Sequence, residues 1–219
     1  MPRAYPYGRI GTKNSKMPGT VYSITATACR TGSKLAQIEG TPCHGCYALR
    51  LERFRPAVHA AYQANLAAWQ AAELTGNTGA WSRNLAAQIT TSGAAYHRWF
   101  DFGDLQSVGM LLAIVNVCEL TPSVKHWLPT QERAMVAEYV SLFGPLPSNL
   151  LVRVSASKID GALPSGAHGS VVVTKDKKTK AYKVPNGATL CEAKTRGNKC
   201  GPCRACWDHA VPAVAYPKH

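Results

Sequence analysis

The chain has 219 residues, of which 46% are hydrophobic and 17% charged, so it can build a folded core and is not a disordered chain. Lys and Arg number 25 against 12 Asp and Glu, a formal net charge of +13. Residues 1–60 carry 9 basic and 2 acidic side chains and residues 151–219 carry 12 and 4, so the excess lies at the two ends. This distribution favours either a polyanionic partner or a solvated basic surface.

No run of about 18 apolar residues is present, so the sequence predicts no membrane span and no membrane partner. The first residues lack the apolar region of a secretory signal. We therefore expect a protein that works in a cytoplasm. Eight cysteines in such a chain argue against a disulfide framework, and their spacing favours metal binding.

Residues 1–50 form a predicted Cys-containing loop region with one short strand at 21–27. A helix is predicted over 50–74, with Pro56 near the start of its main body, because the segment is rich in Ala. The sequence GNTG at 76–79 predicts a break, and residues 81–91 predict a second, shorter helix.

Residues 51–160 are expected to form a βα core. The predicted strands are 95–104, 124–130 and 149–157, and the predicted helices between them are 106–120 and 131–143. Strands and helices that alternate with short connections predict a parallel sheet with right-handed crossovers. The expected fold class is α/β, either a partial (β/α) barrel or an open parallel sheet.

Residues 161–219 complete a single compact domain, 1–219, in this interpretation. They are expected to contain a hairpin at 170–184, whose turn is the basic sequence KDKKTK, and a C-terminal Cys cluster. Polar groups in a parallel sheet collect where the strands end. The candidate catalytic residues are the polar ones at these strand ends: Asp101, Asp104, Thr130 and Ser155.

The C-terminal cysteines have the spacing Cys191-x8-Cys200-x2-Cys203-x2-Cys206. Three cysteines at successive two-residue gaps are typical of bacterial ferredoxins, in which thiolates hold 4Fe–4S clusters. Zinc sites more often use two separate Cys-x2-Cys pairs. The spacing predicts a complete metal site, with an iron–sulfur cluster favoured and zinc as the alternative.

The N-terminal cysteines are Cys29, Cys43 and Cys46, a set of three without an evident fourth. Three thiolates on a cubane leave one iron open to a small molecule. The alternative is a zinc site completed by a histidine, although His44 is expected not to be a ligand. Cys118 lies in the apolar stripe of a predicted helix and is expected to be a plain buried thiol.

Five strings carry a resemblance to a known family: NSKMPG at 14–19, TPCHGCYA at 41–48, FDFGDL at 100–105, HWLPT at 126–130 and KCGPCRACWD at 199–208. They resemble the phage-encoded "gene product 88" family, and the resemblance covers roughly residues 14–219. It implies a virus-encoded protein in a host bacterial cytoplasm.

A looser resemblance is to radical S-adenosylmethionine enzymes, which use a partial (β/α) barrel and three cysteines after the first strand. It implies that Gly103 and Asp104, in the turn after the second strand, contact the cofactor's methionine amino group. It also implies an auxiliary cluster at the C-terminal cysteines. The usual Cys-x3-Cys-x2-Cys spacing is absent, because Cys29 and Cys43 are far apart.

Two classes of function are predicted. The first is a redox or radical enzyme with one or two 4Fe–4S clusters and an open iron that binds a small molecule such as S-adenosylmethionine. The second is a non-enzymatic, metal-stapled basic protein that binds nucleic acid or a host protein through its basic ends. There the metals hold loops together, and bases stack on aromatic residues near those ends: Tyr5, Tyr7, Trp207 and Tyr216. For Trp207, packing on the metal-binding loop is the favoured expectation.

Overall fold

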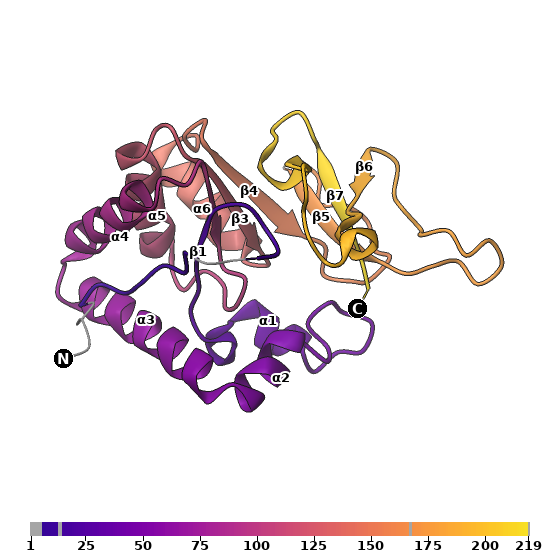
Figure 1. Cartoon of the computed structure of the whole chain (residues 1–219), viewed down its shortest axis with the longest axis horizontal. Helices are drawn as coiled ribbons and strands as arrows, with labels where there is room; N and C mark the ends of the chain where they lie inside the picture. Colours follow the sequence, from indigo (N-terminus) through magenta and orange to yellow (C-terminus); the bar gives the residue numbers. More distant parts are fainter. Residues whose placement is uncertain (1–5, 13–14, 167, 219) are drawn as a thin grey trace.

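Seven strands form one sheet in the computed structural model, which describes residues 6–12, 15–166 and 168–218 (Figure 1). The strands are β1 (Thr20–Tyr22), β2 (Tyr96–Trp99), β3 (Lys125–Thr130), β4 (Leu150–Ser155), β5 (Gly169–Val173), β6 (Ala188–Leu190) and β7 (Ala213–Pro217). Their order is β1-β2-β3-β4-β5-β7-β6, and every paired neighbour is parallel. The predicted α/β class with an open parallel sheet is confirmed. The first five strands follow chain order, as barrel strands do, but the outer strands β1 and β6 do not pair with each other.

Within the described residues, six α-helices and three short 3-10 helices connect the strands. The α-helices are α1 (Thr31–Leu35), α2 (Tyr47–Phe54), α3 (Pro56–Leu74), α4 (Thr78–Ser92), α5 (Val108–Leu120) and α6 (Arg133–Phe143). The 3-10 helices are η1 (Ala26–Ala28), η2 (Ala193–Arg196) and η3 (Ala205–Trp207). The helix predicted over 50–74 is therefore two helices, and Pro56 is the first residue of the second one.

The two faces of the sheet pack against different segments of the chain. Alternate side chains such as Tyr22, Trp99 and Leu128 pack against α3 to α6 and form the main core, and we call this side the helix face. Val21 and Trp127 point to the opposite side and pack against Trp207 of η3 and the neighbouring Cys200 and Cys206. We call this side the cysteine face, because the C-terminal Cys-rich segment covers it.

The predicted hairpin at 170–184 is confirmed around its turn and wrong for the strand β5. Val171 and Val173 are both buried, and β5 pairs with β4 on one side and β7 on the other. A strand buried between parallel neighbours has no free edge for a local hairpin partner. Antiparallel pairing is confined to the base of the exposed basic turn, where Lys175 bridges Tyr182. There Lys183 N donates to the Thr174 carbonyl at 2.9 Å and Asp176 N donates to the Ala181 carbonyl at 2.7 Å.

Two buried histidines lie on the helix face, with ring centroids 5.4 Å apart. His97 Nδ1 is 2.7 Å from the Thr20 hydroxyl and His126 Nε2 is 2.9 Å from the Thr121 hydroxyl. The second ring nitrogen of each has no hydrogen-bond partner within the described part of the chain. Burial lowers the pKa of His97 well below its usual value and that of His126 to about 3.

These lowered pKa values predict acid sensitivity. The unfolded chain takes up protons at these histidines below about pH 6.5 while the folded chain does not, so stability is lost as pH falls through that value. For His126 the loss amounts to about 2 kcal/mol by pH 5. Urea unfolding of His126→Gln at pH 7.5 and pH 5 should show a weaker acid effect than the wild type. His44→Gln, at an exposed position, is the control, and an equal acid effect in all three proteins would contradict the prediction.

Candidate metal centres

The three N-terminal cysteines lie in the segment that leaves the carboxyl end of β1. Cys29 ends η1, Cys43 lies in the turn after α1, and Cys46 immediately precedes α2. All three are half-buried free thiols. The sequence prediction placed these residues in a loop after the first strand, and the structure agrees.

Gly32 in α1 leaves a space beside two of these sulfurs. A β-carbon at this position would lie 3.6 Å from Cys29 Sγ and 3.7 Å from Cys43 Sγ, and 3.1 Å from Cys29 Cβ. The last distance is tighter than ordinary van der Waals contact, so a side chain would press on Cys29. The two sulfurs therefore border one space that glycine keeps open.

The electrostatics connect Cys46 and two carboxylates to the same group of thiols. Burial, together with the negative charges of Cys46, Asp104 and Glu132, raises the pKa of Cys43 to about 11. The pKa of Cys29 is raised by burial and by the charges of the same residues together with Cys43. Several thiolates cannot coexist here without a cation to balance them, and metal ligation is the usual source of one.

Two buried glutamates hold this loop in place. Glu132, at the start of α6, accepts hydrogen bonds from the backbone N–H and the hydroxyl of Thr31, both at 2.7 Å. Glu52 on α2 accepts from Ala26 N at 2.7 Å and from the Thr25 hydroxyl at 2.6 Å. Sequence reasoning missed both residues, because Glu132 and Thr31 are 101 positions apart.

Asp104 and Thr130, two predicted catalytic residues, contact each other. The Asp104 carboxylate accepts from the Thr130 hydroxyl at 2.6 Å and from the backbone N–H groups of Gln131 and Leu105, both at 2.8 Å. Burial raises the pKa of Asp104 to about 7, and the three hydrogen bonds oppose that rise. A carboxyl group with this pKa exchanges its proton near neutral pH, which suits acid–base chemistry.

The Gly103-Asp104 turn also packs tightly on the end of β1. Gly103 has φ +78°, and a β-carbon there would lie 2.3 Å from Ile24 Cγ1. Asp104 does not cap the helix that follows, because Ser107 is the N-cap of α5 and its side chain accepts from Met110 N at 3.0 Å.

The other two predicted catalytic residues lie at the same edge of the sheet but in separate contacts. Asp101 accepts a hydrogen bond from the Ser23 hydroxyl at the end of β1. Ser155 is the last residue of β4, and its Oγ is 3.1 Å from the Oγ of Ser170, the second residue of β5. Of the four predicted residues, Asp104 is the one whose charge acts on Cys29 and Cys43.

The four C-terminal cysteines form a second group of free thiols. Burial raises the pKa of Cys200, and the charges of Cys191 and Cys203 raise it further. Burial raises the pKa of Cys206 to about 12; its Sγ lies 3.1 Å from the Tyr216 hydroxyl, and the charge of Cys191 also acts on it. The four residues predicted to share one site thus act on one another electrostatically.

Two arginines on the cysteine face lie near this second group of thiols. Sequence reasoning missed both. Arg153 in β4 is fully buried, and its guanidinium donates to six backbone carbonyls: Gly169, Ala205, Cys206, Asp208, Val211 and Pro212. Arg98 in β2 stacks on Trp127 at 4.5 Å, and its charge lowers the pKa of Cys200 and Cys206. Buried positive charge beside four thiols is suited to an anionic metal–thiolate group.

No group of three or more His, Cys, Asp or Glu side chains in residues 6–12, 15–166 and 168–218 is close enough to hold a single metal ion. The argument for a metal therefore depends on the all-thiol donor sets, their electrostatic coupling and the space beside Gly32. Within the same residues, no helix is long and apolar enough to cross a membrane.

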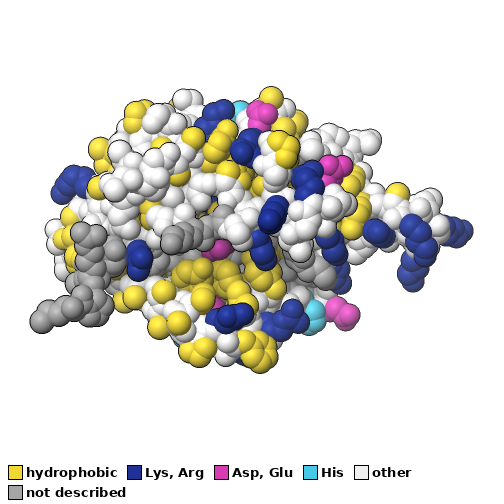
Figure 2. All heavy atoms as spheres, viewed as in Figure 1, with side chains coloured by type: hydrophobic (Ala, Val, Ile, Leu, Met, Phe, Trp, Pro, Cys, Tyr) yellow, Lys and Arg dark blue, Asp and Glu magenta, His cyan; other side chains and the backbone are white. Residues whose placement is uncertain are grey.

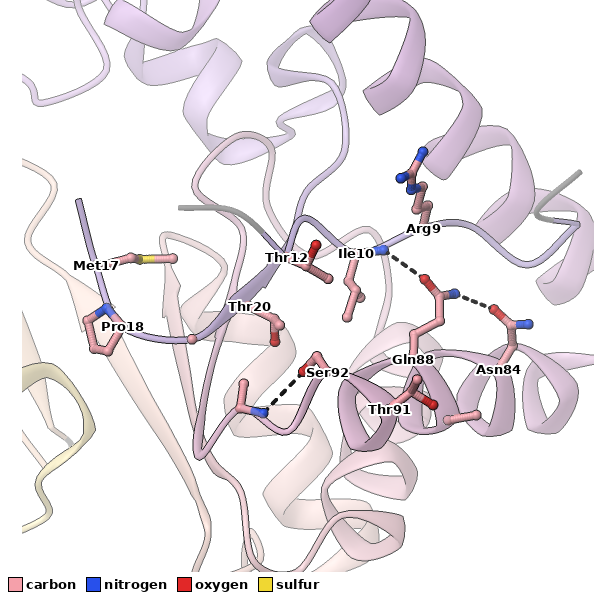
Figure 3. Close-up of a pocket in the computed structure, with 13 residues that line it drawn as sticks. Arg9, Ile10, Thr12, Met17, Pro18, Thr20, Asn84, Gln88, Thr91 and Ser92 are labelled. Atoms are coloured by element: carbon pink, nitrogen blue, oxygen red, sulfur yellow. Dashed lines mark hydrogen bonds between the residues drawn. The ribbon is translucent and has the colours of Figure 1, made fainter. Parts of the chain in front are cut away.

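A pocket of about 870 Å³ opens beside the N-terminal segment (Figure 3). It borders the start of β1 and the end of α4, and its lining contains no cysteine and no acidic residue. Gln88 occupies its wall, where it accepts from Ile10 N at 3.2 Å and donates to Asn84 Oδ1 at 2.6 Å. This pocket offers no donor set for a metal.

A family model described as Gene product 88 matches residues 7–209. The searches of curated proteins and of solved structures found no match to the chain.

Proposed function

The chain belongs to the gene product 88 family, and from this premise we propose that it is an iron–sulfur protein with redox or radical enzyme activity. The N-terminal thiols would hold a 4Fe–4S cluster with one open iron, and the C-terminal thiols would hold a second, fully ligated cluster. The family is of phage origin in this proposal, and the protein works in the host bacterial cytoplasm.

One observation carries the proposal: Cys29, Cys43 and Cys46 lie with Asp104 and Glu132 at the carboxyl edge of a parallel sheet. Both carboxylates are already engaged, Asp104 by Thr130 and backbone N–H groups and Glu132 by Thr31. Three thiols with engaged neighbours leave one metal position for an external ligand. Ligands of parallel sheets bind at this edge.

A bound cluster would supply one-electron transfer and an iron that accepts a ligand. The chain's own residues would transfer protons, bind the ligand and position the thiols. Asp104, held by Thr130, can accept or return a proton beside the thiols, and it suits the ammonium group of an amino acid-like ligand such as S-adenosylmethionine. Asp101 and Ser155 line the same edge on either side. Glu52 and Glu132 fix the loop that positions the thiols.

The test uses protein purified without oxygen. We expect brown protein that contains about four iron and four sulfide, or about eight of each, per chain. The reduced protein should give an electron paramagnetic resonance signal that shifts on addition of S-adenosylmethionine, and Cys43→Ala should lose that signal. Colourless protein that contains zinc, or a shift that persists in Cys43→Ala, would overturn the proposal.

Gly32→Ala tests the N-terminal cluster by the same measurement without removing a thiol. Its β-carbon would enter the space beside the sulfurs of Cys29 and Cys43, so the N-terminal signal should weaken while the C-terminal cluster remains. Gly79→Ala is the matched control, because a β-carbon there meets only Arg83 Nη1, at 3.4 Å. Equal signals in the two variants would show that the space has no role in cluster binding.

A second candidate is a metal-stapled basic protein that binds nucleic acid. It is favoured by the loop after β5, which projects from the molecule and carries four exposed lysines, at 175, 177, 178 and 180 (Figures 1 and 2). Trp207 does not serve stacking: it is buried, donates to the His97 carbonyl and lies in the cluster against which Cys200 and Cys206 pack, as its favoured expectation holds. Tyr5 lies outside the described residues. Zinc-containing protein whose DNA affinity falls steeply with salt would favour this candidate.

A further inference from the structure

Helix α2, directly after Cys46, exposes an apolar stripe. Tyr47, Leu51 and Phe54 are four and three positions apart, so they share one side of the helix. All three are exposed, and Phe54 is 75% exposed. The side of α2 that packs on the protein is a different one and includes the buried Ala48 and Glu52. Tyr47 also serves the fold, because its ring centroid lies 5.7 Å from that of Phe102 and its hydroxyl donates to the Asp101 carbonyl at 3.2 Å. Leu51 and Phe54 belong to no hydrophobic cluster of the described residues and form the part of the stripe that the core does not use.

Basic side chains flank this stripe. Arg50 and Arg53 of α2 and Arg55, just after it, are exposed, and no carboxylate in the described part of the chain pairs with them. The one acid on the helix, Glu52, is buried and bonded to Ala26, Thr25 and His59. Figure 2 shows yellow apolar and dark blue basic side chains side by side over the area where Figure 1 draws α1 and α2.

We propose that this surface, Tyr47, Leu51 and Phe54 with Arg50, Arg53 and Arg55, binds an acidic segment of a partner protein. Apolar side chains at this helical spacing are the anchors by which a helix lies in an apolar groove. Tyr and Arg are also the residues that contribute most to protein interfaces. Carboxylates on the partner would complement the three exposed guanidinium groups, with which no carboxylate of the described residues pairs.

The composition of the stripe favours a protein over the other polyanions. Leu51 lies between the two aromatic residues and offers no flat ring on which a base could stack. The helix has eight residues, about 12 Å of length, which gives a membrane surface only three apolar contacts. Because α2 begins directly after Cys46, the bound partner would lie beside the N-terminal thiols.

The test selects binders from a library of random 16-residue peptides by mRNA display on the full-length protein. We expect enrichment of peptides that combine Asp or Glu with Leu, Ile or Phe. Isothermal titration calorimetry of the selected peptides should show at least tenfold weaker binding to L51A/F54A and to R50E/R53E. The control L142A/F143A removes two exposed apolar side chains from α6 and should bind as the wild type does.

Metal content and circular dichroism of each variant establish that the fold and the thiol sites are unchanged. The proposal fails if no acidic apolar peptide is enriched, or if such peptides bind L51A/F54A as tightly as the wild type. It also fails if anionic lipid vesicles or oligo-dT bind through Leu51 and Phe54 while the peptides do not. None of these results depends on which metal the thiols hold, so they are separate from the test of the proposed function.

Discussion

Replacing Arg153 with methionine is expected to lower the free energy of unfolding by about 3–5 kcal/mol. The guanidinium is fully buried and supplies hydrogen bonds to six carbonyls, five of them between residues 205 and 212. Methionine fills a similar volume but donates nothing, so those carbonyls would remain buried without partners. Chemical denaturation of the two proteins under the same anaerobic conditions measures the difference.

Arg133→Met is the matched control for this substitution. Arg133 is exposed at the start of α6, and its loss should change stability by less than about 0.5 kcal/mol. Arg153→Met should also bind less metal at the C-terminal thiols, because Cys206 and the carbonyls around it lose their common anchor. A variant as stable as Arg133→Met would show that the 205–212 segment holds its position without the arginine.

Cys203→Ser is expected to remove one metal group from the protein. In the proposed state this is a loss of about four iron and four sulfide per chain, with the N-terminal cluster retained. The midpoint of thermal unfolding should fall by about 10 °C, since the loop from Cys200 to Cys206 covers the cysteine face. Metal analysis and a thermal melt of the anaerobic protein provide the two measurements.

Cys118→Ala serves as the control for Cys203→Ser. Cys118 is buried in α5, as the sequence predicts, and lies in the main core with the helices. Its replacement should leave the iron and zinc content unchanged. If Cys203→Ser also leaves both unchanged, the four C-terminal cysteines do not form one metal site.

The middle of the fold could be predicted from the sequence because its signals are local. Residues 124–130 predict β3 at Lys125–Thr130, and residues 106–120 predict α5 at Val108–Leu120, because apolar periodicity and the Thr-Pro break are short-range features. The strands β6 and β7 were not predicted. β6 has three residues and β7 ends in a proline, so their pairing depends on neighbours that are distant in sequence.

The candidate site could be predicted in part, for the same reason. Cysteine spacing identifies the thiols, and strand ends identify Asp104 and Thr130. The supporting residues are invisible in the sequence because their partners are remote. Arg153 appears there only as a charge within an apolar strand, and its carbonyl partners lie up to 59 positions away. A charged residue inside such a run is the signal that should prompt a search for a buried role.

The strand order also has a consequence for folding during biosynthesis. β6 pairs only with β7 within the described sheet, and the N–H of Cys191, just after β6, donates to the Ala215 carbonyl in β7. The ribosome therefore produces β6 and all four C-terminal cysteines before the strand that holds β6 against the sheet. Cys191 cannot take its place beside the other three until residues 213–217 have emerged and inserted between β5 and β6. If metal reached the nascent chain earlier, only Cys200, Cys203 and Cys206 could bind it. Cys191 would add the fourth thiol only when the sheet is complete.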